Sequence, residues 1–285
     1  MKIYHILYNP YANNGKGEDK ANTLKTILKN FHLKFYDITT LEDINFFIEK
    51  TPDNDEIILC GGDGTLNCFI NSVDTDKIKR DIYFFPGGTG NDFLRDIGIK
   101  KADKPIKITQ YLKNLPVVTI NGKEYKFINN ASFGLDGYCC EEADRQRSHK
   151  GKASSYTSIA IKGLLGAYKP KNATVIVDNK VKKYKKVWLS PTMNGRYFGN
   201  GLMAAPEQDR LNKNRSVSLV VMYGSSKIKS LLVMPSMAKG KHIKRKEMIE
   251  VLEGNEITVI YDKPASMQLD GETILNVTRC DIKTN

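Results

Sequence analysis

The stretch EIILCGGDGTL at residues 56–66 decides the fold class of this chain. Its first five residues form a mostly apolar run that predicts a buried strand, and the residues after Gly64 have helical spacing. The glycines between them let backbone N–H groups approach an anion, and the helix N-terminus adds favourable partial charge. A lone glycine turn between a strand and a helix is usually only a turn. The stretch therefore predicts a strand, a turn that can bind phosphate, and a helix.

The same alternation runs through the first 115 residues. We predict strands at 2–8, 33–38, 56–60 and 82–85, and helices at 17–31, at 41–49 with Thr40 as its cap, and after Gly64 and Asn91. Strands that alternate with helices indicate a parallel sheet covered on both faces, so residues 1–115 are predicted to form a doubly wound α/β domain. Ligands of such sheets bind beyond the carboxyl ends of the strands.

The pattern changes near Pro116. The turn pairs Asn121-Gly122 and Asp178-Asn179 predict hairpins. Further strands are expected at 117–120, 125–128, 173–177, 187–190, 217–222, 257–261 and 266–269, and helices at 154–167 and 226–238. Residues 116–285 are therefore predicted to form an antiparallel β-sandwich domain, with a nucleotide expected in a cleft between the two domains.

Three glycine-containing segments follow predicted strands, at 9–17, 61–65 and 86–93. Because parallel strands end at one edge of their sheet, these segments are expected to lie together. The chain lacks the G-x-x-x-x-G-K-[ST] loop, a G-x-G-x-x-G after its first strand, and the H-R-D and D-F-G elements of protein kinases. A phosphate site of another kind is indicated.

These segments resemble known motifs. Gly61 to Thr65 is similar to the G-G-D-G-T signature of diacylglycerol kinases, sphingosine kinases, NAD kinases and phosphofructokinases, and residues 88–93 resemble the G-T-x-N-D-F motif of the lipid-kinase branch. Asn9-Pro10 resembles the opening of that branch, residues 240–242 its G-x-H segment, and residues 270–272 its D-G-E motif. The order and spacing of these motifs, which extend through essentially the whole chain, resemble those of the bacterial diacylglycerol kinase family.

The resemblance implies an ATP- and Mg²⁺-dependent lipid kinase with the fold of NAD kinases and diacylglycerol kinases. Such an enzyme transfers the γ-phosphate of ATP to a lipid hydroxyl, here diacylglycerol to give phosphatidic acid, although the sequence does not identify the lipid. An NAD kinase-like enzyme is one alternative. A lipid- or nucleotide-binding homologue with weak catalysis is another.

The resemblance also implies roles for individual residues. The residues expected to contact the nucleotide are Asn9, Pro10, Thr39, Thr40, Gly61, Gly62, Asp63, Gly64, Thr65, Asn67, Gly88, Thr89, Asn91 and Asp92. Asp63 and Asp136 are expected to serve Mg²⁺, which prefers oxygen ligands. The structural alternatives are that Asp63 and the pair Asn91-Asp92 cap helices, and that Asp136 lies in a turn.

The D-G-E motif is expected to carry the catalytic groups. Asp270 is the predicted general base, which would take the proton of the lipid hydroxyl. Glu272 would face the same side of an extended segment and either orient Asp270 or be the base itself. Without the other motifs, Asp-Gly would be read as a surface turn.

One segment departs from the family. Many members carry an acidic D-G-x-x-D segment that holds a structural Mg²⁺, and residues 214–218 here read Asn-Arg-Ser-Val-Ser. Both acids are missing and a guanidinium already supplies positive charge, so we expect no second metal there.

Charge and composition bear on partners. The formal net charge is +12, and residues 145–186 contain twelve Lys or Arg and a single acid, Asp178. Such a stretch suits an anionic membrane surface, whereas recognition motifs for nucleic acid are missing. No apolar run approaches the ~20 residues that span a bilayer. We therefore expect a cytoplasmic protein, peripheral at the inner membrane face.

The five cysteines fit that compartment. They form no C-x-x-C pair, and the adjacent Cys139 and Cys140 suit the two faces of a strand. We expect all five to be reduced and structural. The sequence leaves the oligomeric state open, with a homodimer as one option.

Overall fold

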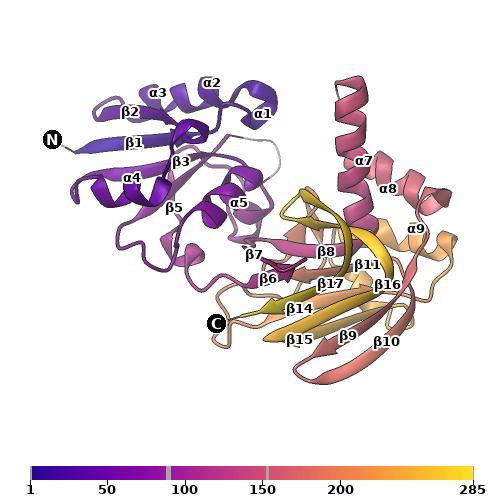
Figure 1. Cartoon of the computed structure of the whole chain (residues 1–285). Coiled ribbons are helices and arrows are strands. Elements are labelled where there is room, and N and C mark those ends of the chain that lie inside the picture. Colours follow the sequence, from indigo (N-terminus) through magenta and orange to yellow (C-terminus); the bar gives the residue numbers. More distant parts are fainter. Residues whose placement is uncertain (1, 88–90, 152–153, 285) are drawn as a thin grey trace. The chain divides into compact units, whose positions relative to one another are not determined.

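The computed structural model describes residues 2–87, 91–151 and 154–284. The chain divides into two compact units, Met1–Leu115 and Pro116–Asn285. Unit 1 combines helices with a sheet, and unit 2 is built mainly of antiparallel strands (Figure 1). The predicted α/β domain followed by a β-sandwich domain is confirmed.

Unit 1 is built on one sheet with the order β2-β1-β3-β4-β5. Its strands are β1 Ile3–Tyr8, β2 His32–Asp37, β3 Glu56–Gly61, β4 Ile82–Pro86 and β5 Ile106–Lys107. The first four are parallel, because β1 pairs in parallel with β2 and β3, and β3 with β4. The short β5 adds an antiparallel edge that the sequence pattern did not indicate. Apolar side chains of β1, β3 and β4 meet those of the helices in a buried core.

The helices of unit 1 are shorter than predicted. They are α1 Ala12–Gly15, α2 Gly17–Asn22, α3 Leu24–Ile27, η1 Ile38–Thr40, α4 Ile44–Lys50, α5 Asp63–Ser72, α6 Asp92–Asp96 and η2 Thr109–Leu112. The single helix predicted at 17–31 is wrong. The Thr23 hydroxyl donates to the Lys20 carbonyl, 2.7 Å away, and such local bonds compete with helix continuation.

The predicted cap of the next helix is also wrong. The Asp43 carboxylate, not Thr40, accepts the N–H of Phe46 at 3.0 Å and begins α4. Thr40 lies in η1, where its hydroxyl donates to the Asp37 carbonyl. Both residues are good caps in isolation, and only the path of the chain after β2 selects between them.

Unit 2 is a β-sandwich joined by one long strand. Its strands are β6 Val117–Ile120, β7 Lys123–Lys126, β8 Asn130–Gly134, β9 Lys171–Val177, β10 Lys180–Val187, β11 Leu189–Met193, β12 Tyr197–Phe198, β13 Leu202–Met203, β14 Val217–Met222, β15 Ile249–Gly254, β16 Glu256–Leu269 and β17 Glu272–Lys283. β16 pairs with β17 on one side, and on the other with β9 in its first half and β8 in its second. The main apolar core contains side chains from all four of these strands.

Two strand predictions need correction. The runs predicted at 257–261 and 266–269 are one strand, β16, whose pairing shifts between Ile260 and Met267. Pro264 lies in that interval and cannot donate to a ladder, which explains the gap in the pattern. The run predicted at 187–190 crosses the boundary between β10 and β11. The turns Asn121-Gly122 and Asp178-Asn179 are confirmed, since all four residues have positive φ.

The helices of unit 2 include one that the sequence did not reveal. They are α7 Leu135–Lys150, α8 Tyr156–Lys162, η3 Gly163–Ala167, α9 Lys227–Met237 and η4 Lys241–Lys244. The prediction that Cys139 and Cys140 lie in a strand is wrong, because both lie in α7. That helix is largely polar, so it lacks the apolar period by which helices are recognised. Across the described ranges, no helix is both long and apolar enough to cross a bilayer.

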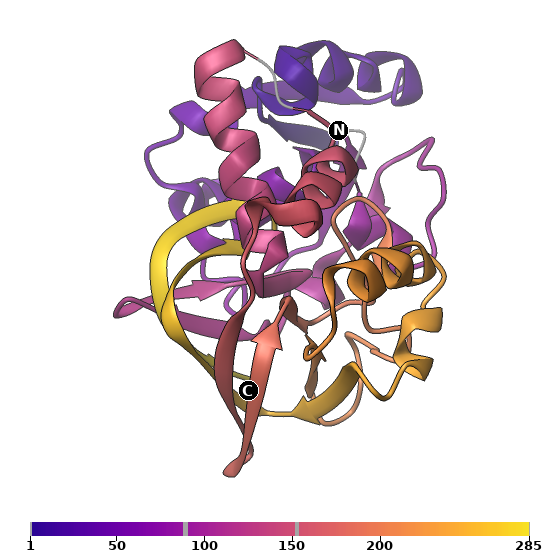
Figure 2. The same ribbon diagram turned by 90° about the vertical axis from the view of Figure 1, so that its right-hand side faces the viewer.

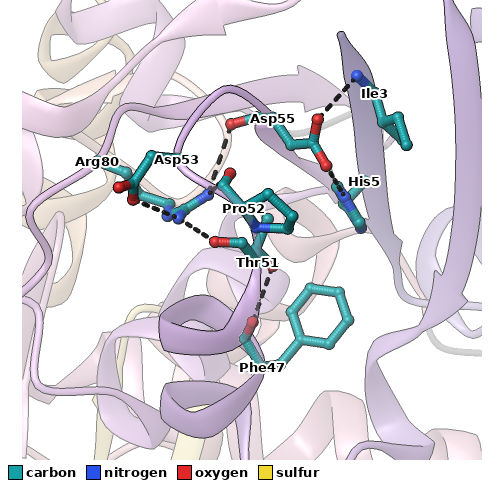
Figure 3. Close-up of polar contacts among 8 residues, drawn as sticks. All are labelled: Ile3, His5, Phe47, Thr51, Pro52, Asp53, Asp55 and Arg80. Atoms are coloured by element: carbon teal, nitrogen blue, oxygen red, sulfur yellow. Dashed lines mark hydrogen bonds and ion pairs between the residues drawn. The ribbon is translucent and has the colours of Figure 1, made fainter. Parts of the chain in front are cut away.

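A buried carboxylate ties the start of β1 to the loop before β3 (Figure 3). Asp55 accepts the Ile3 N–H at 3.0 Å and contacts the His5 ring nitrogen at 3.0 Å. The Arg80 guanidinium donates to carbonyls of the same loop, at Thr51 and Pro52. The hydrogen bond with His5 holds the pKa of the Asp55 carboxyl below its ordinary value.

We predict that Asp55→Asn destabilises unit 1 by about 1–3 kcal/mol, because the charged partner of His5 is lost inside the fold. A depressed carboxyl pKa contributes stability above its ordinary value of about 4, and that stability is lost as the pH falls through the folded pKa. Amide hydrogen exchange of β1 and β3 measures both effects. The wild type should lose protection on acidification more steeply than the variant.

The matched control is Asp53→Asn in the same loop. Asp53 is exposed and lies 3.6 Å from Arg80, so its loss should change stability by less than about 0.5 kcal/mol. Equal exchange rates in the two variants would contradict the role given to Asp55.

Candidate functional site

The ends of β3 and β4 are held close together by glycines. The Gly87 N–H donates to the Gly61 carbonyl at 2.6 Å. A Cβ on Gly87 would lie 3.2 Å from the Gly61 Cα, and a Cβ on Gly61 would lie 2.2 Å from the Thr65 hydroxyl. No larger residue fits at Gly61 unless the Thr65 side chain moves, so the turn packs closely against α5 on one side and against the Gly87 backbone on the other. Thr65 and Asn67 are both buried in α5, and Thr65 packs directly on the turn.

The loop after β1 closes on itself. The Asn9 side chain accepts the Tyr11 N–H at 2.9 Å. Asn13 and Asn14 have φ of 54° and 57°, the left-handed region that asparagine tolerates. A Cβ on Gly17 would lie 1.9 Å from the Asn9 carbonyl oxygen, so the chain returns tightly to Asn9-Pro10. Position 17 therefore requires glycine, because any side chain would collide with the Asn9 carbonyl.

The loop after β2 presents Thr39 and Thr40, both exposed. The Thr39 N–H and hydroxyl both donate to the Asp37 carboxylate, at 2.9 and 2.7 Å. The Thr40 hydroxyl donates to the Asp37 carbonyl at 2.9 Å. As nucleotide contacts the two threonines stay a prediction.

Asp63 joins two of the predicted loops. It is the first residue of α5, and its carboxylate accepts the N–H of Asp92 at 2.8 Å. Asp63 therefore caps a helix, but the helix is α6, whose first N–H group it accepts. Asp92 is buried, and its carboxylate lies 3.2 Å from the Arg95 guanidinium. Asn91 directly precedes α6, whereas Gly88 and Thr89 lie outside the described residues.

Asp63 can supply the single protein carboxylate that a Mg²⁺ site shared with substrate phosphates needs. Within the described ranges, no group of three or more His, Cys, Asp or Glu side chains is arranged to hold a metal. Mg²⁺ in phosphate-transfer sites is usually bound by one or two protein carboxylates together with substrate phosphates and water. Asp63, held beside the start of α6, meets that lower requirement.

In unit 2, Asp270 and Gly271 form the turn between β16 and β17. Their φ values are 48° and 98°, and Leu269 pairs with Glu272 across the turn. This is the two-residue hairpin that Asp-Gly favours. The prediction that Asp270 and Glu272 face one side of an extended segment is therefore wrong.

The Asp270 carboxylate is buried on the backbone of residues 128–130. One oxygen accepts the N–H groups of Asn129 and Asn130 at 2.8 and 2.9 Å, and the other accepts that of Ile128 at 2.7 Å. The Asp270 N–H returns a bond to the Asn130 carbonyl at 3.0 Å. Hydrogen bonds from three amides stabilise the charged form of a carboxylate.

A buried arginine reaches the same backbone segment from the other side. Arg210, only 7% exposed, donates to the Ile128 carbonyl at 3.1 Å and to the Asn129 side chain at 3.3 Å. Asn194 also donates to the Ile128 carbonyl, at 2.9 Å. Residues 128–130 thus bind an anionic side chain through their N–H groups and a cationic one through the Ile128 carbonyl and the Asn129 side chain.

Asp136 is connected to the hairpin turn by Gln268. The Gln268 amide donates to Asp136 at 2.7 Å, and its oxygen accepts the Gly271 N–H at 2.7 Å. Asp136 lies in the first turn of α7 and also accepts from the Tyr156 hydroxyl. Burial raises the pKa of the Asp136 carboxyl, against the opposing effect of these donors. As a residue serving Mg²⁺, Asp136 stays a prediction.

Glu272 differs from Asp270 in its surroundings. It is exposed at the start of β17. Partial desolvation, followed by the negative charge of Asp144, raises the pKa of its carboxyl. A carboxylate with a raised pKa accepts a proton more readily than an ordinary one.

The segment that departs from the family is occupied by side-chain hydrogen bonds. The Ser218 hydroxyl donates to Gln208 at 2.6 Å, and the Ser216 hydroxyl to Glu253. Arg215 donates to the Arg210 carbonyl at 3.4 Å.

Three residues of this network, Arg210, Gln268 and Tyr156, were not predicted from the sequence. Arg210 lies four residues beyond Pro206 in a stretch without a motif, and a single Arg in a basic chain gives no signal. Gln268 could have been noticed, because it stands two residues before the D-G-E aspartate. Tyr156 is twenty residues from Asp136, and only the packing of α8 brings it there.

Family models match both units. The diacylglycerol kinase catalytic domain matches residues 4–120, and the YegS C-terminal NAD kinase beta sandwich-like domain matches residues 129–280. The chain belongs to this diacylglycerol kinase-like family of kinases. The family predicted from the sequence motifs is confirmed.

The sequence identity to individual relatives is low. The chain is 23% identical over 286 residues to the "Diacylglycerol kinase" of Bacillus subtilis (strain 168), covering 95% of this chain and 90% of that protein. It is 24% identical over 231 residues to "Putative lipid kinase YtlR" of the same organism, covering 76% and 73%. A crystal structure of "a putative diacylglycerol kinase" from Bacillus anthracis str. Sterne matches with a TM-score of 0.70 at 20% identity, over 100% and 92% of the two chains. That likeness shows a shared fold.

We predict that Asp270→Asn destabilises unit 2 by about 1–3 kcal/mol. An asparagine has one acceptor oxygen, so its NH₂ would face a backbone N–H that the carboxylate now accepts, and that buried donor would lose its partner. The only tryptophan, Trp188, lies in unit 2, so its fluorescence in a urea titration reports the loss.

Glu272→Gln is the control at the neighbouring position. Its side chain is exposed, and stability should change by less than about 0.5 kcal/mol. A fully stable Asp270→Asn protein would show that the three amide contacts contribute nothing to unit 2.

Proposed function

We propose that this protein is an ATP- and Mg²⁺-dependent lipid kinase that transfers the γ-phosphate of ATP to a lipid hydroxyl. Diacylglycerol, with phosphatidic acid as its product, is the first acceptor to test. The observation that carries the proposal is the joining of the loops after β3 and β4, by Gly61–Gly87 and Asp63–Asp92, in a kinase-family chain.

Unit 1 supplies the nucleotide half of the proposed reaction. The first N–H groups of α5 have no partner within the helix, and with the glycines beside them they suit phosphate oxygens. Asp63 is the carboxylate that would hold Mg²⁺, and the ion would neutralise charge on the transferring phosphate. Its hydrogen bond to the Asp92 N–H keeps that carboxylate oriented.

Unit 2 supplies the proton acceptor. As the lipid oxygen bonds to the γ-phosphorus, the bond from phosphorus to the ADP oxygen breaks and the hydroxyl proton must leave. The exposure and raised pKa of Glu272 support it as the base, since the oxygens of Asp270 accept backbone N–H groups. Asp270, the base predicted from the motif, then positions the turn that carries Glu272.

A second candidate is a homologue with weak catalysis. It is favoured by Asn214 and Ser218, which stand where many relatives have acids. The purified protein is incubated with labelled ATP and either a lipid panel or NAD. Transfer of label to a lipid indicates the lipid kinase, transfer to NAD indicates the NAD kinase-like enzyme, and transfer to neither indicates the weak homologue. Label in a lipid product is the outcome that supports our proposal.

The proposed substrate also suggests a location. A lipid acceptor resides in a bilayer, and the basic residues at 145–186 suit anionic lipid. We propose that the enzyme is cytoplasmic and acts peripherally at the inner membrane face.

We predict that Asp63→Asn abolishes Mg²⁺-dependent transfer while the fold stays intact. The amide oxygen of asparagine can still accept the Asp92 N–H, so the structural contact survives and only the charge is lost. Turnover of labelled ATP with lipid measures the effect.

Asp43→Asn is a matched control for that variant. Asp43 caps α4 by the same kind of bond, and asparagine is an equally good cap, so turnover should be unchanged. If Asp63→Asn keeps wild-type turnover, Asp63 is only a cap and the metal assignment fails.

We predict that Glu272→Gln lowers kcat by about 10²–10⁴-fold, the usual contribution of a general base. ATP affinity should change little, because the predicted nucleotide contacts belong to unit 1. Single-turnover phosphorylation and ATP binding are measured separately, at a temperature where Glu272→Gln and Asp270→Asn are both folded.

The comparison of the two variants decides the roles. A larger loss in Asp270→Asn than in Glu272→Gln would return the base to Asp270. A loss below about tenfold in both, equivalent to ~1.4 kcal/mol of barrier, would make the D-G-E motif a structural turn.

A further inference from the structure

Unit 2 exposes an apolar face on two neighbouring helical segments. Ile161 and Leu165 of the α8–η3 segment are 42% and 65% exposed, and Ile228 and Leu232 of α9 are 71% and 73% exposed. In each segment the two residues are four apart, which places them on one side of a helix. Four of the seven large apolar side chains that unit 2 exposes within the described ranges therefore lie on these two segments.

The inner sides of the same segments are fixed in the protein. Ile159 and Leu164 of the first segment, and Val233 and Met237 of α9, are buried in one common core cluster. The segments also pack against each other, since η3 contacts α9. Figures 1 and 2 both show α8 and α9 as neighbours at one end of the sandwich. The exposed leucines and isoleucines are thus held outward by a well-packed base.

The two stretches that form this face carry charge of one sign, and the neighbouring α7 brings one acid, Glu142, into the hollow that Lys162 lines. Residues 154–177 contain three lysines, residues 223–246 contain seven lysines or arginines, and neither stretch contains Asp or Glu. Within the described part of the chain, the structure gives no ion pair to Lys162, Lys169, Lys227 or Lys229, which are all exposed. Lysines beside apolar side chains can lay their stems along an apolar surface while their ammonium groups reach anions.

We propose that this face, formed by α8, η3 and α9, docks on an anionic lipid bilayer, with Ile161, Leu165, Ile228 and Leu232 entering the boundary between headgroups and acyl chains. Exposed apolar residues on helices flanked by lysines are the pattern of interfacial membrane binding. The choice of a bilayer over an acidic protein rests on the proposed function, which requires a lipid acceptor. Of the basic stretch at 145–186, the proposed face includes Lys162 and Lys169, and it adds Lys227 and Lys229 of α9. The four apolar side chains add a contribution to binding that charge alone would not give.

The test measures flotation of the purified full chain with vesicles of phosphatidylcholine alone, or of equal parts phosphatidylcholine and phosphatidylglycerol, without nucleotide. The wild type should prefer the anionic vesicles. Ile228→Ser/Leu232→Ser should weaken binding at least about tenfold, and this deficit should persist at high salt because apolar burial is not screened. Lys227→Ala/Lys229→Ala should weaken binding about fivefold per lysine at low salt, and that deficit should vanish at high salt.

Matched variants on the β9–β10 and β16–β17 hairpins serve as controls. Val181→Ser/Leu275→Ser removes apolar side chains of unit 2 that are 59% and 51% exposed, and Lys180→Ala/Lys183→Ala removes exposed lysines; both variants should bind vesicles as the wild type does. Each control tests whether the effect belongs to the helical face or to any exposed apolar or basic residue.

Three results would overturn the proposal. They are wild-type binding by the Ile228→Ser/Leu232→Ser variant, an equal loss in the hairpin controls, and a vesicle-free dimer that this variant converts to monomer, which would make the face an interface between copies. Kinase activity is measured separately on a short-chain, water-dispersed diacylglycerol. Vesicle binding without activity would leave the docking face standing and remove the lipid kinase, so the two failures are distinguishable.

Discussion

The contact between the Asp270 carboxylate and the N–H groups of residues 128–130 governs the arrangement of unit 2. It joins residues about 140 positions apart in sequence, at the point where β8 begins and β16 ends. A buried carboxylate needs this many donors, since an isolated charge inside a protein is costly. Gln268, Asp136 and Tyr156 extend the network into α7 and α8. The hairpin turn that presents Glu272 is therefore held from two directions.

The turns of unit 1 pack closely because glycines at three positions carry no side chain. Gly61, Gly87 and Gly17 stand where a Cβ would meet backbone or the Thr65 side chain, so the turns after β1, β3 and β4 can pack closely. Close packing leaves the helix N-terminus of α5 beside these turns, as phosphate binding requires. The Asp63–Asp92 bond then fixes one turn to the next. The chemistry proposed for this unit depends on backbone as much as on side chains.

The roles of charged residues in this protein follow from their burial. Arg210 is buried and donates to the Ile128 carbonyl and the Asn129 side chain, whereas Lys162, Lys169, Lys227 and Lys229 on and beside the α8–η3 segment and α9 are exposed and have no acidic residue in their own stretches. A buried cation whose hydrogen bonds are satisfied contributes to local structure, and exposed cations act on what approaches the surface. A net charge of +12 alone does not separate these two uses.

The class of fold could be predicted from the sequence, because strand runs, turn pairs and glycine motifs are local signals. The sequence identified β1, β3, β4, β6 and β14 closely, the two hairpin turns, and the motifs that place the chain in its family. It did not reveal α7, because that helix is largely polar and its apolar residues do not recur with the helical period. It also did not show that β16 continues across Pro264. It also missed Arg210 and Gln268, and it read Asp270 and Glu272 as neighbours on one extended face. Only the tertiary structure shows that Asp270 is buried on three backbone N–H groups while Glu272 is exposed. Those N–H groups belong to residues 128–130, about 140 positions away, so the local sequence around the turn cannot specify them.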